Sequence, residues 1–203
     1  MPKIVDRDKK RSEIARKAIE VLARRGFQAT TIQDIADASG LGKGTVYHYF
    51  KTKEEILLAV SGELLNDMER SLGAALLRKE LPADKLSVLI RESLRLTEEM
   101  EHLFIVYLEL LLMDLRGSRH GDCMAMIKNL LHNMRGMVAG FIEEGKKRGD
   151  WPKDADSSAL AVYLIASFDG VLAHYLMDRA SFDIEHVGDA FARFFLRERE
   201  PDK

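Results

Sequence analysis

The feature that most constrains this chain is helical spacing of its apolar residues, which recur every three or four positions along nearly all of its 203 residues. The pattern holds over residues 14–22, 32–38, 56–68, 86–96, 103–115, 124–148, 160–177 and 187–195. No segment alternates apolar and polar residues as a half-buried strand would. The sequence therefore predicts an all-α fold of about nine helices and no strands.

Composition excludes several classes of protein. Hydrophobic residues make up 46% of the chain and charged residues 32%, the balance of a soluble globular protein. The single Cys123 excludes a disulfide framework and a cysteine-based zinc site. No apolar run approaches the ~18 residues of a membrane span, and the polar start resembles no secretory signal. We therefore expect a cytoplasmic protein with no metal, no cofactor and no membrane partner.

The small net charge of −2 hides an asymmetry along the chain. Residues 1–53 contain 12 Lys and Arg against six Asp and Glu, a net charge of +6. The other 150 residues contain 19 basic and 27 acidic residues, a net charge of −8. A basic head on an acidic body suggests contact with a polyanion, although a solvated helix surface would look the same.

Two short helices in the basic segment suggest the nature of that polyanion. Thr30 or Thr31 can cap a helix over residues 32–38, Gly40 permits a tight turn, and a second helix runs over residues 43–49. This arrangement is typical of a helix-turn-helix, whose second helix lies in the DNA major groove. The outer face of that helix is polar or cationic and has no acidic residue to repel phosphate: Lys43, Thr45, Tyr47 and His48.

The boundaries on either side of this unit follow from local signals. Gly26 ends the preceding helix, and Gly42 is expected to cap the second short helix. Thr52 and Glu55 form a predicted capping box that opens the long helix after Phe50.

The run from Thr31 to Glu55 resembles the DNA-binding signature of the TetR family of bacterial regulators. The resemblance covers about residues 8–60 and rests on the Ile35-Ala36 pair, the Gly40 turn, the aromatic cluster 47–50 and the start of the next helix at residues 53–55. It implies an all-helical homodimeric repressor with an effector pocket in its C-terminal body. The implied domains are a DNA-binding head, 1–53, and a ligand-binding and dimerisation body, 54–203.

The resemblance also implies which residues contact double-stranded operator DNA. Tyr47 would contact a phosphate, His48 the backbone or a base edge, and Lys43 and Thr45 the groove floor. Lys53 stands at a helix start, where phosphate is attracted. The full predicted set is Thr31, Gln33, Lys43, Gly44, Thr45, Tyr47, His48 and Lys53.

A homodimer interface is expected in the last two helices. The segment 160–177 is apolar on nearly every side, which favours burial on both sides, and the last helix carries a broad aromatic face. The alternative is that both helices fill a monomer core. The predicted interface residues are Leu160, Tyr163, Leu164, Val171, Phe191, Phe194 and Phe195.

The effector is the least constrained prediction. Polar or aromatic side chains within apolar helices mark a candidate pocket, although each is more often a core or surface residue. The candidates are His102, Tyr107, Glu109, Met113, His132, Phe168 and His174. The abundance of Leu, Met and Phe suggests an apolar or amphipathic ligand, with acyl-CoA, a quaternary amine and a planar aromatic compound all open.

Other functions remain as alternatives. An enzyme finds little support, because the chain has no Gly-rich phosphate loop, no His-Glu-x-x-His and no nucleophile elbow. A helix-turn-helix regulator without a small-molecule effector, acting through protein partners or as an activator, is the main alternative.

Overall fold

The computed structural model describes residues 7–117 and 121–196, with the backbone alone for residues 194–196. Within these ranges the chain forms nine α-helices and no strand, which confirms the predicted fold class. The helices are α1 (Arg7–Arg25), α2 (Ile32–Ala38), α3 (Lys43–Tyr49), α4 (Lys53–Leu76), α5 (Pro82–Ser93), α6 (Glu98–Leu115), α7 (Gly121–Arg148), α8 (Ser157–Met177) and α9 (Ile184–Leu196).

The helices group into two compact units. Unit 1 comprises Met1–Met68 and Thr97–Ile127, and unit 2 comprises Glu69–Leu96 and Lys128–Lys203. Helices α4 and α7 each pass from one unit into the other.

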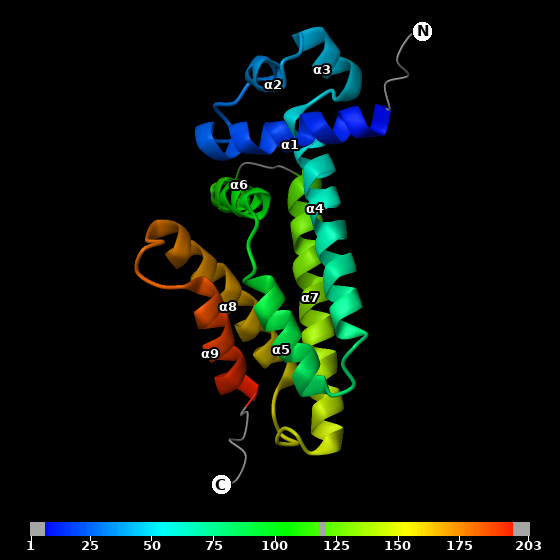
Figure 1. Ribbon diagram of the computed structural model, residues 1–203, viewed down its shortest axis with the longest axis vertical. Helices are drawn as coiled ribbons and strands as arrows, with labels where there is room; N and C mark the ends of the chain where they lie inside the picture. The colour runs from blue at the N-terminus through cyan, green and yellow to red at the C-terminus, as the bar shows by residue number, and fades with distance from the viewer. Residues whose placement is uncertain (1–6, 118–120, 197–203) are drawn as a thin grey trace. The chain divides into compact units, whose positions relative to one another are not determined.

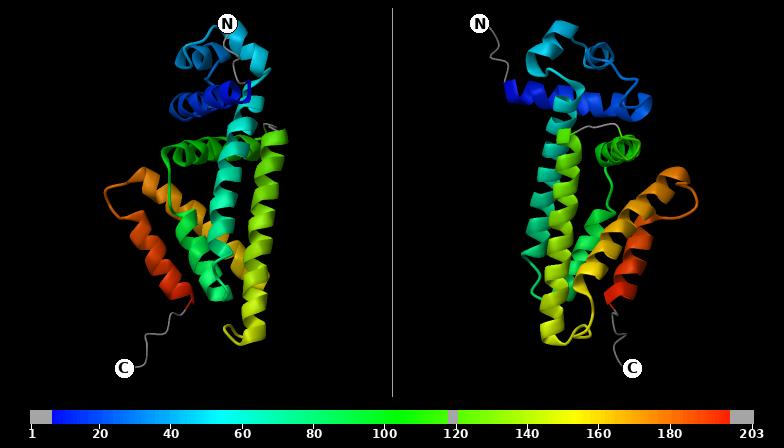
Figure 2. Two further views of the ribbon diagram at one scale, coloured as in Figure 1. Left: turned by 45° about the vertical axis from the view of Figure 1, so that its right-hand side comes forward. Right: turned by 180° about the vertical axis from the view of Figure 1, so that it is seen from behind.

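Unit 1 is built around α1. Helix α1 lies between the α2–α3 pair on one side and α6 on the other, as Figures 1 and 2 show from three directions. Its buried face is the predicted one, since Ile14, Ala18, Ile19 and Leu22 are all at most 1% exposed. These side chains join a single core with apolar residues of α2, α3, α4 and α6.

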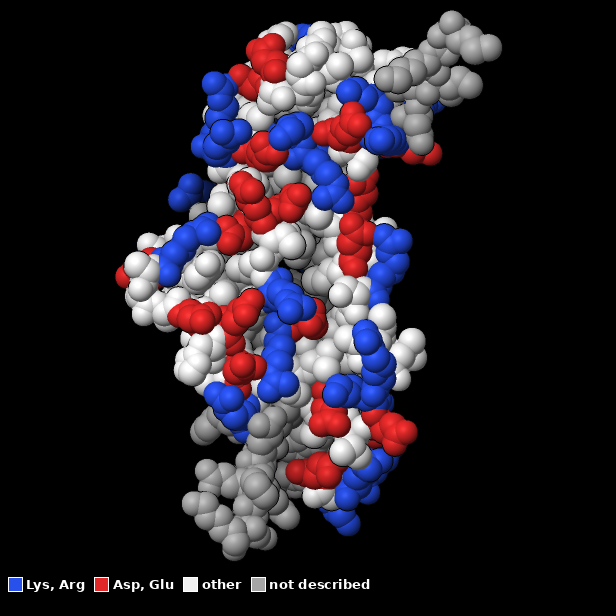
Figure 3. Space-filling view, viewed as in Figure 1, with Lys and Arg blue, Asp and Glu red and all other residues white. Residues whose placement is uncertain are grey.

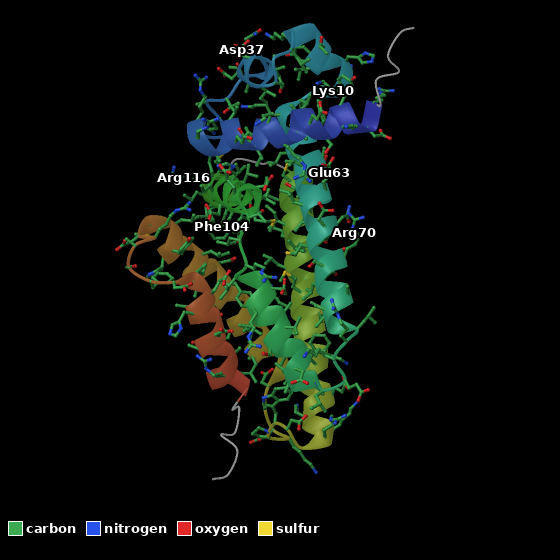
Figure 4. The ribbon with its side chains drawn as sticks, in the orientation of Figure 1. Lys10, Asp37, Glu63, Arg70, Phe104 and Arg116 are labelled. Atoms are coloured by element: carbon green, nitrogen blue, oxygen red, sulfur yellow. The ribbon has the colours of Figure 1, made fainter. Side chains whose placement is uncertain are left out.

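A cluster of ion pairs around Arg16 joins α1 to α4 and α6 on the outside of that core. The Arg16 guanidinium lies 3.8 Å from Glu63, 3.5 Å from Asp67 and 3.6 Å from Glu99. Glu63 lies on α4 near the crossing with α1 (Figure 4), where it also accepts a hydrogen bond of 2.6 Å from the Ser12 hydroxyl. Because these groups are partly exposed, each pair contributes at most about 1 kcal/mol.

Unit 2 packs α5 against α9 and buries one side of α8. Gly188 of α9 allows the close approach to α5, since a Cβ there would lie 3.2 Å from the Leu94 side chain. At the α7–α8 corner the Trp151 ring occupies the space where a Cβ on Gly145 would stand. Asp156 then caps α8 by accepting hydrogen bonds of 3.0 Å from the Ser158 and Ala159 amides.

One boundary differs from the sequence analysis. The apolar periodicity over residues 86–96 predicts a helix through Leu96, but α5 ends at Ser93 and α6 begins at Glu98. Leu94 is nevertheless 1% exposed, so it belongs to the core without being helical. Thr97 caps α6 by accepting a 3.3 Å hydrogen bond from the Met100 amide, which is the local reason why a new helix starts there.

Candidate nucleic-acid interface

The start of α2 is fixed by a complete capping box. The Thr31 hydroxyl accepts from the Asp34 amide at 3.2 Å, and the Asp34 carboxylate accepts from the Thr31 amide at 2.8 Å. Asp34 also pairs with Arg25 at the end of α1. Thr30, by contrast, is 1% exposed and donates to the Gly26 carbonyl, so Thr31 is the cap and Thr30 braces the turn.

The turn between the two short helices has the predicted geometry. Gly40 adopts φ +64°, a left-handed conformation that a side chain rarely adopts, and the Leu41 amide returns to the Ala36 carbonyl at 2.9 Å. Gly42 then begins α3 in an extended conformation, as expected, without a side-chain cap.

Helix α3 has a single buried residue and a polar outer face. Val46 is fully buried, while the predicted residues Lys43, Gly44, Thr45, Tyr47 and His48 are all exposed. Tyr47 keeps 40% of its surface exposed, with the Lys43 ammonium 5.9 Å from its ring centre. The structure thus brings five predicted residues together on one short helix that contains no carboxylate.

The end of α3 is attached to α1 by Arg11, a role that the sequence analysis missed. The Arg11 guanidinium donates to the Tyr49 carbonyl at 3.0 Å and lies 4.3 Å from the centre of the buried Phe50 ring. A long-range contact of this kind, 38 residues apart, leaves no mark in local spacing.

Two other predicted DNA-contacting residues have partners within the chain. Gln33 is exposed on α2, and its amide donates to Asp37 at 2.7 Å. Lys53 is half-buried and directs its ammonium inward, 2.5 Å from the Phe27 carbonyl and 3.3 Å from the Gln28 carbonyl. The predicted Thr52–Glu55 capping box forms only in part, because the Glu55 carboxylate accepts from the Lys51 amide instead of from Thr52.

The basic excess of residues 1–53 does not form one continuous patch on the face in Figure 3. Acidic and basic side chains are interspersed there, in keeping with pairs such as Lys10–Glu13 and Lys17–Glu20 on α1. The local composition of α3, more than the summed charge, therefore distinguishes this surface.

The predicted effector residues are divided between the two units. His102, Tyr107, Glu109 and Met113 lie on α6 in unit 1, and His132, Phe168 and His174 lie in unit 2. His132 and His174 are exposed, whereas Met113 and Phe168 are buried. His102 has a buried Nδ1 without a hydrogen-bond partner in the described residues, and Tyr107 packs 5.6 Å from Phe104. Glu109 is bound to backbone amides of unit 1.

The predicted dimer residues also differ in exposure. Tyr163 is 67% exposed, and its neighbour Val162 is 47% exposed. Leu160, Val171 and Phe191 are half-buried, whereas Leu164 is fully buried within the subunit and has no surface left for a partner. The side chains of Phe194 and Phe195 lie outside the described residues.

Helix α8 is also the one described helix that is long and apolar enough, by length and composition alone, to cross a membrane. A core helix of a soluble protein meets the same criterion. The sequence analysis found no uninterrupted apolar run there because Ser167, Asp169 and His174 fall within it.

Nothing in the described residues suggests a catalytic centre. They contain no group of three or more His, Cys, Asp or Glu side chains able to hold a metal ion. Burial raises the pKa of the Cys123 thiol to about 11, with Glu54 and Asp122 adding negative charge. A thiol with that pKa stays protonated at neutral pH and is a poor nucleophile.

The comparisons with known proteins agree with this geometry. Residues 14–60 match the family model for bacterial regulatory proteins of the tetR family, and residues 61–197 match the model for the C-terminal region of YsiA-like proteins. The chain belongs to the TetR family. It is therefore a DNA-binding transcription regulator and not an enzyme, which confirms the resemblance drawn from residues 31–55.

Individual relatives support the same fold over nearly the whole chain. The fatty acid metabolism regulator protein of Bacillus subtilis (strain 168) is 24% identical over 167 residues, 82% of this chain and 84% of that protein. The transcriptional regulator FadR from Bacillus subtilis in complex with stearoyl-CoA has a TM-score of 0.76 at 22% identity, covering 93% of this chain and 98% of that one. A transcriptional regulator from Saccharomonospora viridis in complex with choline has a TM-score of 0.79 at 22% identity, covering 94% and 96%.

The capping box of this TetR-family head gives a prediction about pH. The Thr31 hydroxyl and amide, followed by Arg25, hold the pKa of Asp34 below its ordinary value. A lowered folded-state pKa stabilises the folded state above the unfolded-state pKa of about 3.9, and this contribution is lost as pH falls through the folded-state pKa. We therefore expect Asp34→Asn to lower the melting temperature by a constant amount from about pH 8 to about pH 5, with the difference closing below about pH 4.

The measurement is the melting temperature of both proteins across this pH range. Asp37→Asn is the matched control, because it removes a carboxylate from the same helix outside the capping box. If the difference for Asp37→Asn closes at the same pH, the effect belongs to net charge and not to the cap.

Proposed function

We propose that this protein is a homodimeric repressor that binds a palindromic operator and leaves it when an amphipathic effector with a long apolar chain binds. In this proposal residues 1–53 form the DNA-binding head and residues 54–203 the effector-binding and dimerisation body. The protein acts in the cytoplasm, where bacterial chromosomal DNA is found.

The observation that carries the DNA-binding proposal is the outer face of α3. A helix of seven residues with one buried side chain and no acidic residue presents hydroxyl, amine and imidazole groups together. Such groups bind phosphates and base edges in the major groove. We assign Tyr47 and His48 to the backbone, and Lys43 and Thr45, with Gly44 between them, to the groove floor.

Helix α2 supplies the remaining direct contacts. The exposed Thr31, which caps α2, and the exposed Gln33 in its first turn are assigned to the DNA backbone. Lys53 has a different role in this proposal, because its ammonium already binds two carbonyl groups of unit 1. We assign it to holding the head together instead of to direct phosphate contact.

A dimer is needed because one helix of seven residues reads too few base pairs to be specific. Helix α8 offers an exposed apolar stripe at helical spacing, formed by Ala159, Val162, Tyr163, Ala166 and Gly170. An unpaired apolar helix face of this kind marks an interaction surface. Two-fold pairing of α8, with α9 beside it, would present two α3 helices to the two halves of a palindrome.

An alkyl chain is the effector that these helices suit best. Between Met126 and Met137, α7 carries a half-buried apolar stripe about 16 Å long. Met and Leu side chains of this kind adapt to a flexible apolar ligand. Two relatives point the same way, since one is named a fatty acid metabolism regulator and another was solved with stearoyl-CoA. The choline complex of a third makes a quaternary amine the alternative.

The first experiment tests the interface on α3. A DNA duplex is selected by the wild-type protein from a random pool, and its affinity is measured from about 50 to about 200 mM salt. Lys43→Ala should weaken binding and reduce the slope of log K against log salt by up to about 1.8, because each dimer loses two positive charges from the groove, where a cation displaces counterions from the flanking phosphates.

Lys17→Ala, which removes a lysine paired with Glu20 on α1, is the matched control and should leave the slope unchanged. Thr45→Ala, by contrast, should relax base preference at one step of the selected sequence. An unchanged slope for Lys43→Ala would remove α3 from the interface.

The second experiment tests the dimer. Tyr163→Glu places a charge on the exposed stripe of α8 and should convert dimer to monomer in sedimentation, because burying an unpaired charge costs several kcal/mol. Leu77→Glu is the control, since Leu77 is an equally apolar residue of unit 2 with 90% exposure. A dimer that survives Tyr163→Glu would remove α8 from the interface.

The third experiment tests the effector. Stearoyl-CoA should raise the melting temperature and release the selected duplex, whereas coenzyme A alone and choline should do neither. At a ligand concentration of about 100 times Kd the stabilisation is about 2.7 kcal/mol. Release by choline alone would favour the quaternary amine, and a regulator that no compound releases would favour control through protein partners.

A further inference from the structure

The short link between α1 and α2 is held by an unexpected partner on α6. Gly26 ends α1 with φ +86°, and the amides of the next two residues donate to one carboxylate. The Phe27 amide lies 2.5 Å from Glu109 Oε2, and the Gln28 amide lies 3.3 Å from Oε1. A Cβ at Gly26 would stand 3.3 Å from the same carboxylate, so glycine is what allows this approach.

The carbonyl groups of Phe27 and Gln28 are bound by Lys53, the first residue of α4. The Lys53 ammonium binds the Phe27 and Gln28 carbonyls and lies 4.8 Å from the centre of the Phe27 ring. Phe27 itself is 2% exposed, so these charged groups act on a segment that is already anchored in the core. The Phe27 and Gln28 backbone is therefore hydrogen-bonded to the Glu109 carboxylate of α6 and to the Lys53 ammonium of α4.

The position of this segment determines where α2 begins. The Thr30 amide and hydroxyl both donate to the Gly26 carbonyl, at 3.2 and 2.7 Å, and the next residue is the Thr31 cap. Only five residues thus lie between Gly26 and the first residue of α2. The hydrogen bonds of residues 27, 28, 30 and 31 restrict their backbone conformation. Since α3 packs against α2, a shift of the link would carry the exposed face of α3 with it.

We propose that Glu109 is a positioning residue for operator binding, which acts with Lys53 as a clamp on Phe27 and Gln28. The clamp sets the distance between α6 and the α2–α3 pair across the end of α1. Neither residue touches DNA in this arrangement. Each acts through the backbone that it holds.

A second polar interaction of α6, between Glu99 and Arg16 of α1, is weaker than the Glu109 hydrogen bonds and lies near the start of α6. Glu99, in the first turn of α6, lies 3.6 Å from Arg16, whose guanidinium it shares with two carboxylates of α4. That pair is about 40% exposed on both sides, so water and salt screen it. The carboxylate bound to two backbone amides is the stronger restraint, because each hydrogen bond is charge-assisted.

The test is Glu109→Gln, which keeps the shape of the side chain but turns one of its two acceptors into a donor facing an amide. The first readout is amide hydrogen exchange, and protection should fall across residues 28–38 while α5 and α9 keep theirs. The second is affinity for the duplex selected by the wild-type protein, which should fall about tenfold at a temperature well below the melting point.

Lys53→Met, which keeps the apolar stem, should give the same pattern from the carbonyl side. The double variant should weaken binding by less than the two single effects combined, because both act on one segment. Glu98→Gln, which removes the same charge from the exposed first turn of α6, is the matched control and should resemble the wild type.

The proposal relies on the proposed role of α3 only for its binding readout. If the wild type selected no duplex, the operator-binding proposal would fail, while hydrogen exchange would still test the clamp. Unchanged protection of residues 28–38 in both single variants would overturn the clamp. A folded Glu109→Gln protein with wild-type affinity would show that the carboxylate only stabilises the fold.

Discussion

The structure of α3 depends on the burial of two side chains, one within the helix and one directly after it. Val46 and Phe50 are both 0% exposed and belong to the core that α1 organises. A helix of seven residues is not stable alone in water, so α3 exists only while this packing holds it. Burial of each side chain contributes about 1.5–3 kcal/mol, which is enough to offset the cost of a nucleus of one or two turns.

Several basic residues of the predicted head, residues 1–53, help to hold this packing in place by binding other groups of the chain. Arg11 binds the carbonyl group at the end of α3, and Arg25 pairs with the Asp34 carboxylate of α2. Lys53 binds the Phe27 carbonyl in the link between α1 and α2. A positively charged segment in a DNA-binding protein is thus partly scaffold. The exposed side chains of the short helices, such as Lys43, Thr45 and Tyr47, are positioned by this scaffold and have little internal packing of their own.

A feature could be predicted from the sequence when the residues that determine it lie close together along the chain. Gly26, Gly40 and a threonine cap at residue 30 or 31 act within four residues, and all three were predicted because local conformational preferences decide them. The end of α5 was predicted three residues too late, since Leu94 continues the apolar spacing although its backbone leaves the helix.

The roles of Glu109 and Lys53 could not be predicted for the same reason. Their bonds to Phe27 span 82 and 26 residues, and no periodic or motif signal connects positions that far apart. Glu109 stands out in sequence only as a carboxylate among apolar residues of α6, which fits a ligand contact as well as a structural bond. Lys53 stands at a helix start, where the electrostatic argument for phosphate applies equally to the carbonyl groups that it binds.

The two helices that bind Phe27 and Gln28 are both connected along the chain to unit 2. Lys53 is the first residue of α4, which continues without a break into unit 2, and α6 is joined to unit 2 through residues 94–97. The first connection is helical throughout, whereas the second includes the non-helical residues 94–97. The Phe27 and Gln28 peptides are hydrogen-bonded to both helices, to α4 through Lys53 and to α6 through Glu109. In the proposed function, a ligand would alter operator binding only to the extent that it binds one arrangement of these helices more tightly than another.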